Sequence, residues 1–361
     1  MASVLSMDFR ERDDSPIRVL IVDDSVVART VLARMLDDRA DFEVAGLAGS
    51  AAAALAMLTS MQVDIILLDL DMPQMNGIAA LPALIERGRG ARVLVVSSAC
   101  AEGASSTLAA LSQGAADTLL KPGVTSFAGR FADELCDRLC RIARSIGPVQ
   151  TISPNLAERP ARVSQRLDCL AIGASTGGVH ALSEFFGALA ADFAAPILVT
   201  QHLPPPFMPH FADQLREMTG RPARVAAPGM LPNPGEILLA PGDAHLTLAR
   251  TGSVIHVRLE RSAVPSGCRP SVDPMLASIG RLFGAGALGV VLSGMGRDGA
   301  NGAEHLVAAG GAMLVQDAAS SVVWGMPGVI ANAGLAQMVA PPAELARRVS
   351  SWGQAGISRW M

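Results

Sequence analysis

Three carboxylates follow apolar runs in the first third of the chain. Asp23 and Asp24 come directly after the run at 18–22, and Asp69 follows the run at 65–68. Short β-branched runs that alternate with alanine- and leucine-rich stretches predict parallel strands joined by helices. The carboxyl ends of such strands meet at one edge of a sheet, so we expect the three carboxylates to lie together. They would repel one another without a hard cation among them, which predicts a Mg²⁺ site.

A hydroxyl and an amine complete a set suited to phosphoryl transfer. Ser97 follows a third apolar run, and Lys121 closes a later one. A metal-bound carboxylate can attack a phosphoryl group, while an ammonium and a hydroxyl hydrogen-bond the transferred oxygens. Asp69 is the predicted nucleophile because it ends a buried strand and precedes the Met72-Pro73 turn. The alternative, that the first two aspartates merely cap a helix, does not account for the other three groups.

These residues resemble the receiver domains of two-component response regulators. The likeness rests on Val22-Asp23-Asp24-Ser25, Asp69-Leu70-Asp71-Met72-Pro73, Asn76-Gly77, Ser97 and Lys121-Pro122. It implies a flavodoxin-like fold with a parallel five-stranded sheet. It also implies a Mg²⁺ site for phosphorylation, with ligands from Asp23, Asp24, Asp69 and the backbone carbonyl of Asp71. Asp69 would be the phosphoacceptor, Ser97 the switch hydroxyl and Lys121 the phosphate contact. Thr118 stands where the family often has an aromatic residue.

A glycine-rich turn surrounds one serine in the second half of the chain. Gly173-Ala174-Ser175-Thr176-Gly177-Gly178 lies between an apolar run and a helical pattern. A serine at a sharp strand-to-helix turn can act as a nucleophile, and the first amides of the helix can stabilise an oxyanion. The same kind of turn can cradle a phosphate or a dinucleotide, so the turn alone leaves both chemistries open.

A base and a carboxylate occur at the ends of other predicted strands. His202 directly follows one strand, and Asp298 follows another through a short glycine-containing segment. Ser175, His202 and Asp298 can therefore meet at one sheet edge, and a triad is defined by roles rather than by chain order. Ser175 would attack an ester carbonyl, His202 would move the proton and Asp298 would hold the imidazole. His245 is the rival base, and we assign it to the pocket.

The second half resembles the chemotaxis protein-glutamate methylesterases. The likeness rests on segments 172–178, 201–202, 239–245, 269–273, 293–299 and 323–328. It implies a catalytic domain that demethylates glutamate methyl esters, with methanol released, and that deamidates glutamines. It assigns catalysis to Ser175, His202 and Asp298 and places Met295 near the oxyanion, where we also place Thr176. It implies no cofactor in this domain.

Length and composition predict two domains. The chain has 361 residues, of which 50% are hydrophobic, which is too long for one ordinary core. Periodicity disappears after residue 144 and returns at Leu167. We therefore expect a disordered extension at 1–16, a receiver at 17–141 and a linker at 142–166. A catalytic domain at 167–355 would be a doubly wound α/β unit with a mainly parallel sheet.

Composition also limits the location and partners of the protein. Its apolar stretches are shorter than the roughly 20 residues that cross a bilayer, and mixed charges near the start do not suit a secretory signal. We expect a cytoplasmic protein with reduced cysteines. A net charge of −4, with 29 lysines and arginines, argues against a nucleic-acid partner.

The two halves together suggest a regulated enzyme. We expect the unphosphorylated receiver to pack over the Ser175 edge and phosphorylation of Asp69 to open it. Chemoreceptors would be the substrates, and the enzyme would reach them by peripheral association with receptor arrays. A chemotaxis histidine kinase would be the phosphodonor. One alternative is a response regulator with a non-catalytic, partner-binding output domain, and another is a nucleotide-binding enzyme that uses the glycine-rich turn.

Overall fold

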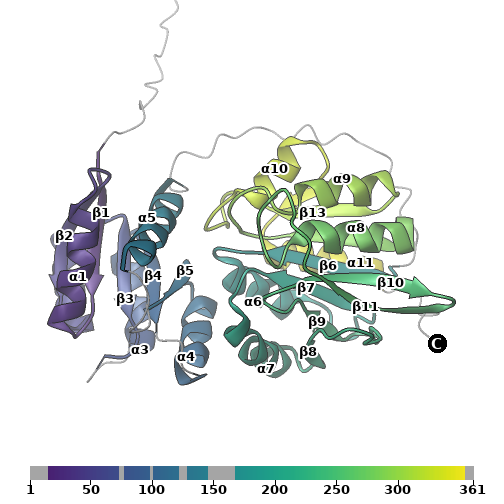
Figure 1. Cartoon of the computed structure of the whole chain (residues 1–361), viewed down its shortest axis with the longest axis horizontal. Helices are drawn as coiled ribbons and strands as arrows, with labels where there is room; N and C mark the ends of the chain where they lie inside the picture. Colours follow the sequence, from purple (N-terminus) through teal and green to yellow (C-terminus); the bar gives the residue numbers. More distant parts are fainter. Residues whose placement is uncertain (1–14, 73–76, 98–100, 122–127, 145–166, 354–361) are drawn as a thin grey trace, which may run out of the picture.

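The computed structural model describes residues 15–72, 77–97, 101–121, 128–144 and 167–353. Two α/β units lie side by side in it (Figure 1). The predicted extension at 1–16 and linker at 142–166 fall almost entirely outside the described residues. None of the helices in the described ranges combines the length and apolar character needed to cross a membrane.

The N-terminal unit is built on a parallel five-stranded sheet with the order β2-β1-β3-β4-β5. Its strands are β1 Ile17–Val22, β2 Phe42–Ala48, β3 Ile65–Asp69, β4 Arg92–Ser97 and β5 Asp117–Leu120. Its helices are α1 Val26–Asp37, α2 Ala51–Met57, α3 Gly77–Arg87, α4 Ala101–Ser112 and α5 Ala128–Arg144. This sheet confirms the predicted flavodoxin-like fold.

Local sequence explains where these elements begin. Ser25 caps α1 by accepting a hydrogen bond from the backbone N–H of Ala28, and Ser50 caps α2 in the same way. Every residue of β3 is buried, as expected for a central strand covered on both faces. Consequently Asp69, the last residue of that strand, has a fixed position at the carboxyl edge of the sheet.

The C-terminal unit contains a parallel seven-stranded sheet with the order β14-β13-β12-β6-β7-β9-β8. Its strands are β6 Cys169–Ala174, β7 Ile197–Gln201, β8 Ala223–Val225, β9 Ile237–Leu239, β12 Ala287–Val291, β13 Ala312–Gln316 and β14 Met338–Ala340. The antiparallel hairpin of β10 His245–Thr251 and β11 Val254–Glu260 stands apart from this sheet. The predicted doubly wound α/β domain is confirmed.

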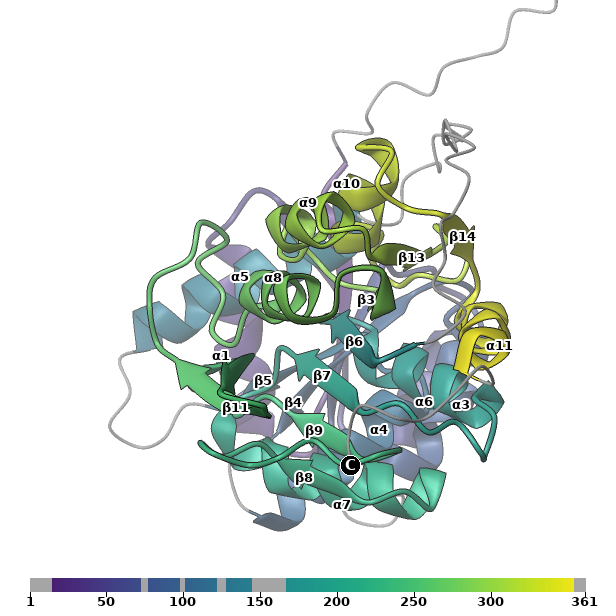
Figure 2. The same ribbon diagram turned by 90° about the vertical axis from the view of Figure 1, so that its right-hand side faces the viewer.

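Helices cover both faces of the larger sheet (Figure 2). One face carries α6 Gly178–Ala188, α7 Met208–Thr219 and α11 Pro342–Gly353. The other carries α8 Val272–Phe283, α9 Ala300–Ala308 and α10 Met326–Asn332. Alternate residues of β6 point to the two faces, with Leu170 in one apolar cluster and Ala171 in the other. Short 3₁₀ turns at Pro205–Phe207 and Gly284–Gly286 complete the unit.

The α4–β5 side of the receiver packs against the catalytic unit. Helix α4 contacts α6, α7 and the 3₁₀ turn before α7. Val322 and Val323 of the catalytic unit belong to the same buried apolar cluster as Leu119 and Phe131 of the receiver. The backbone N–H of Gly177 donates to the carbonyl oxygen of Ala116, at 2.7 Å. The two units therefore meet beside the glycine-rich turn.

Candidate active site

An acidic cluster lies at the carboxyl edge of the receiver sheet. Asp23, Asp24 and Asp69 each offer a carboxylate oxygen, and these oxygens lie within 4.8 Å of one another. Lys121 Nζ lies 2.7 Å from Asp69 Oδ2 and 3.3 Å from Asp23 Oδ2. Burial alone would lower the pKa of Lys121, but the hydrogen bond and charge of Asp69, then those of Asp23, raise it above its usual value. A protonated Lys121 offsets part of the negative charge, and the all-oxygen donor set suits a hard cation such as Mg²⁺.

The remaining receiver residues lie around this cluster. The backbone N–H of Asp71 donates to Asp69 Oδ1 at 3.3 Å. Ser97 is buried, and its Oγ lies 3.5 Å from Thr118 Oγ1. Thr118 thus has a hydroxyl group at the position where many receivers have an aromatic ring. This hydroxyl is in hydrogen-bond contact with Ser97, the predicted switch residue. Asn76, Pro73 and Pro122 lie outside the described residues.

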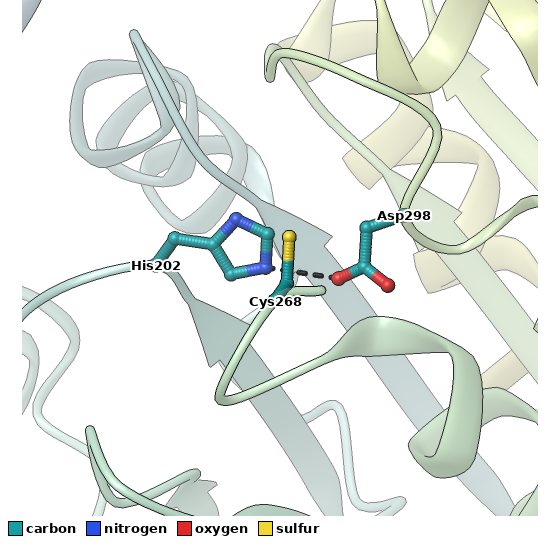
Figure 3. Close-up of side chains that lie close together, drawn as sticks. All are labelled: His202, Cys268 and Asp298. Carbon is teal, nitrogen blue, oxygen red and sulfur yellow. Dashed lines mark hydrogen bonds and ion pairs between the residues drawn. The ribbon is translucent and has the colours of Figure 1, made fainter. Parts of the chain in front are cut away.

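Ser175, His202 and Asp298 come together at the carboxyl edge of the larger sheet. Ser175 follows β6, His202 follows β7, and Asp298 lies beyond β12. His202 Nδ1 lies 3.1 Å from Ser175 Oγ, and His202 Nε2 lies 2.9 Å from Asp298 Oδ2. The close-up shows the imidazole edge turned toward the carboxylate (Figure 3). The three side chains form one continuous hydrogen-bonded chain.

Asp298 is held as a buried carboxylate by several donors. Besides His202, the hydroxyl groups of Ser266 and Ser271 donate to Oδ1 at 3.0 and 2.5 Å, and the Val272 N–H donates to Oδ2 at 2.8 Å. Burial acts to raise the pKa of Asp298, but hydrogen bonding to His202 and its charge, followed by Ser271 and Val272, lower it below the usual value. An ionised Asp298 accepts the Nε2–H of His202, which leaves the Nδ1 lone pair facing Ser175.

The turn that carries the serine is fixed on several sides. Gln201 Nε2 donates to the Ser175 carbonyl oxygen at 2.9 Å, and the Ser175 N–H donates to the Ser293 carbonyl oxygen at 3.0 Å. Gly177 has φ +74°, and a Cβ there would lie 2.5 Å from Val322 Cβ, so only glycine fits. The Gly177 N–H is occupied by the receiver, and the Gly178 N–H donates back to Ser175 O.

The three predicted pocket residues differ in their surroundings. Thr176 Oγ1 donates to Asp117 Oδ2 of the receiver at 2.9 Å. Met295 is partly buried and packs against the apolar cluster shared by the two units. His245 is fully buried: its Nδ1 accepts from the Ser271 N–H, and its Nε2 lies 2.8 Å from the Ser262 carbonyl oxygen. His245 is therefore connected to Asp298 through Ser271.

Sequence reasoning missed the residues that hold Asp298 and the one that contacts Thr176. Ser271 is the N-cap of α8, a serine before an apolar helical run, and that local signal could have placed it. Val272 can approach Asp298 because Gly173 has no side chain. A Cβ on Gly173 would lie 2.5 Å from Val272 Cγ1. No sequence pattern indicated a role for Asp117, because its partner Thr176 lies in the other unit.

Fold and site together define a class of protein, a response-regulator receiver joined to an α/β hydrolase unit. The model of the CheB methylesterase family matches residues 170–349, and that of the response regulator receiver domain matches residues 19–126. A protein-glutamate methylesterase/protein-glutamine glutaminase of Caulobacter vibrioides is 40% identical, over 92% of this chain and 98% of its own. One of Trichodesmium erythraeum is 34% identical, over 92% and 97%.

A solved structure agrees with these matches. The CheB methylesterase catalytic domain of Thermotoga maritima is 32% identical with a TM-score of 0.50, and the match covers 51% of this chain and 97% of that one. The chain belongs to the CheB methylesterase family, in the form that carries an N-terminal receiver domain. The resemblance inferred from the sequence is confirmed, and the family assignment favours a hydrolytic output domain over a non-catalytic one.

Proposed function

We propose that this enzyme hydrolyses glutamate methyl esters on chemoreceptors, with Ser175 as the nucleophile, and deamidates receptor glutamines by the same chemistry. The observation that carries the proposal is the hydrogen-bonded chain from Ser175 through His202 to a buried, ionised Asp298. The competing nucleotide-binding interpretation fits less well, because the Gly177 and Gly178 amides that would face a phosphate already have partners.

The geometry supports a two-step acyl transfer. Ser175 Oγ attacks the ester carbonyl while His202 Nδ1 takes the hydroxyl proton. The imidazolium, stabilised by Asp298, then gives that proton to the leaving methoxide, so that methanol departs and an acyl-enzyme remains. Water attacks the acyl group, His202 takes its proton and returns it to Ser175, and the free glutamate is released. With a glutamine substrate, ammonia leaves in place of methanol.

The oxyanion site belongs to the same proposal. We assign it to the backbone near Thr176, which follows Ser175 in the chain, and near Met295, whose neighbour Gly294 lies against Ser175. Donors aimed at the developing oxyanion lower the barrier by roughly 3–4 kcal/mol each in comparable hydrolases. His245 supports the site indirectly by fixing Ser271, which holds Asp298.

The receiver would regulate this chemistry through Asp69. We assign Mg²⁺ binding to Asp23, Asp24, Asp69 and the backbone of Asp71; when bound, the ion neutralises the carboxylates and the incoming phosphoryl oxygens. Lys121 and Ser97 would hold the transferred phosphoryl group. A chemotaxis histidine kinase in the cytoplasm would be the donor, and contact with the receptor arrays would be peripheral.

Strand β5 offers a route between the two sites. Asp117 begins the strand and contacts Thr176, while Lys121 follows its end and contacts Asp69. In the unphosphorylated state the receiver holds the turn next to Ser175 and restricts substrate access. Phosphorylation moves Lys121 onto the phosphoryl group and weakens the contact at the other end of the strand.

The test is methanol release from methylated receptor membranes, with and without a small phosphodonor and Mg²⁺. Release that rises with the phosphodonor and is abolished by Ser175→Ala supports both the triad and its regulation. Asp69→Asn is the matched control, because it leaves the triad intact but removes the phosphoacceptor. Release that persists in Ser175→Ala would overturn the assignment of the nucleophile.

A further inference from the structure

A cysteine lies next to the candidate triad. His202, Cys268 and Asp298 each offer one metal-binding atom, and these atoms all lie within 4.8 Å of one another (Figure 3). We propose that these three side chains bind a Zn²⁺ ion, or a similar soft divalent cation, and that this ion reversibly inhibits the enzyme. The inhibition rests on the proposed catalytic roles of His202 and Asp298, whereas the binding does not.

The donor set is the first argument. Imidazole nitrogen, thiolate sulfur and carboxylate oxygen are the groups that bind zinc in proteins, at about 2.0–2.3 Å. In a tetrahedral site such distances separate the donors by about 3.3–3.8 Å. His202 Nε2 and Asp298 Oδ2, now 2.9 Å apart, need to separate slightly, and the thiol needs to approach by at most about 1 Å. Three protein ligands leave one position open for water, so that the ion can exchange.

The surroundings of the three side chains are compatible with metal binding. Asp298 is 1% exposed and anchored by Ser271 and Val272, so its carboxylate is already oriented. The His202 side chain is 17% exposed, which leaves a path for an ion. Cys268 lies between β11 and α8 in a segment without helix or strand, where a side chain can shift at low cost.

A role for the thiol alone is less well supported. Burial, then the negative charge of Asp298, raise the pKa of Cys268, so the free thiol stays protonated and is a poor nucleophile. A divalent cation reverses this situation, because it displaces the thiol proton and is attracted by the same carboxylate.

Binding would block catalysis at its first step. With zinc on Nε2, the neutral imidazole carries its proton on Nδ1, the nitrogen that faces Ser175 Oγ. His202 can then no longer accept the serine proton, and Asp298 is engaged by the ion. One proton leaves Cys268 for each ion bound. None of the three ligands belongs to the receiver, so zinc should inhibit the enzyme without phosphorylation of Asp69.

The binding test uses the metal-free full chain and Co²⁺, whose complexes with thiolates absorb strongly in the near ultraviolet. A thiolate–cobalt band is expected, abolished by Cys268→Ser and retained in Cys140→Ser, which packs against the receiver core. Ser175→Ala should retain the band. Absence of the band in the unsubstituted chain, or its persistence in Cys268→Ser, would overturn the site.

The inhibition test uses Zn²⁺ in the methanol-release assay without phosphodonor. With each variant compared to its own zinc-free rate, Cys268→Ser should need at least about tenfold more zinc for half inhibition. Asp24→Asn, which weakens the receiver cluster, should leave the zinc response unchanged. Equal zinc sensitivity of Cys268→Ser and the unsubstituted chain would refute the proposal. If the cobalt band forms but hydrolysis never depends on Ser175, the proposed function fails while the metal site stands.

Discussion

Removal of the Asp117 side chain should activate the unphosphorylated enzyme. Asp117 Oδ2 accepts the Thr176 hydroxyl across the boundary between the two units, one residue from Ser175. Its other oxygen accepts the Thr118 N–H and pairs with Arg138 at 3.3 Å, both within the receiver. Asp117→Ala therefore removes one hydrogen bond between the units, together with contacts that orient the carboxylate.

The size of the effect follows from the nature of this bond. A hydrogen bond to a charged group contributes about 1.5–3 kcal/mol, and partial exposure of Asp117, at 19%, favours the lower end. Each 1.4 kcal/mol corresponds to about a tenfold change in an equilibrium constant. We therefore expect the ratio of closed to open molecules to fall about tenfold. Other contacts, such as His180 Nδ1 with the Ser112 carbonyl at 2.7 Å, keep the units associated.

The assay is methanol release by the full chain without phosphodonor. The basal rate of Asp117→Ala should rise up to about tenfold, while its fully phosphorylated rate stays near that of the unsubstituted chain. Asp133→Ala is the matched control, because it removes an aspartate whose ion partner, Arg39, lies on the receiver itself. A basal rate no higher than that of Asp133→Ala, in a variant of normal stability, would refute the coupling.

Three further changes test other parts of the structure. Asp69→Asn should abolish activation by phosphodonor and leave the basal rate unchanged, as measured by methanol release. Ser271→Ala should raise the pKa of Asp298. The lowered pKa of Asp298 stabilises the fold above the unfolded value of about 3.9, and this contribution is lost as the pH falls through the folded value. The variant should thus be about 1–2 kcal/mol less stable in urea near neutral pH, with the difference shrinking in acid. Gly177→Ala should lose about 1–3 kcal/mol in the same assay, whereas Gly187→Ala, which meets nothing within 4 Å, should lose none.

The strands and the residues at their ends could be predicted because their signals are local. The run at 65–68 is apolar throughout, and the structure has β3 at Ile65–Asp69. The strand predicted to precede His202 lies at Ile197–Gln201, which leaves His202 at the carboxyl edge. The carboxyl ends of parallel strands meet at one edge of a sheet. Functional residues that directly follow such strands can therefore be predicted from the sequence.

The contacts that tune the site could not be predicted in this way. Asp298 is held by donors from the 266–272 segment, which arrives by the packing of α8 against β6 and not by any periodic pattern. Cys268 reaches the triad on that same segment. The hydrogen bond between Asp117 and Thr176 depends on how the surfaces of the two folded units fit together. The sequence of either unit alone does not predict this contact.

The position of β5 also has a thermodynamic consequence for the receiver. One four-residue strand touches the turn beside Ser175 at one end and leads to Lys121 at the other. Linkage between two sites is reciprocal, so a factor by which phosphorylation favours substrate binding is also the factor by which bound substrate favours the phosphorylated form. A chemoreceptor engaged at Ser175 would therefore act as an effector of Asp69, and the substrate would help to set the fraction of molecules in the phosphorylated form.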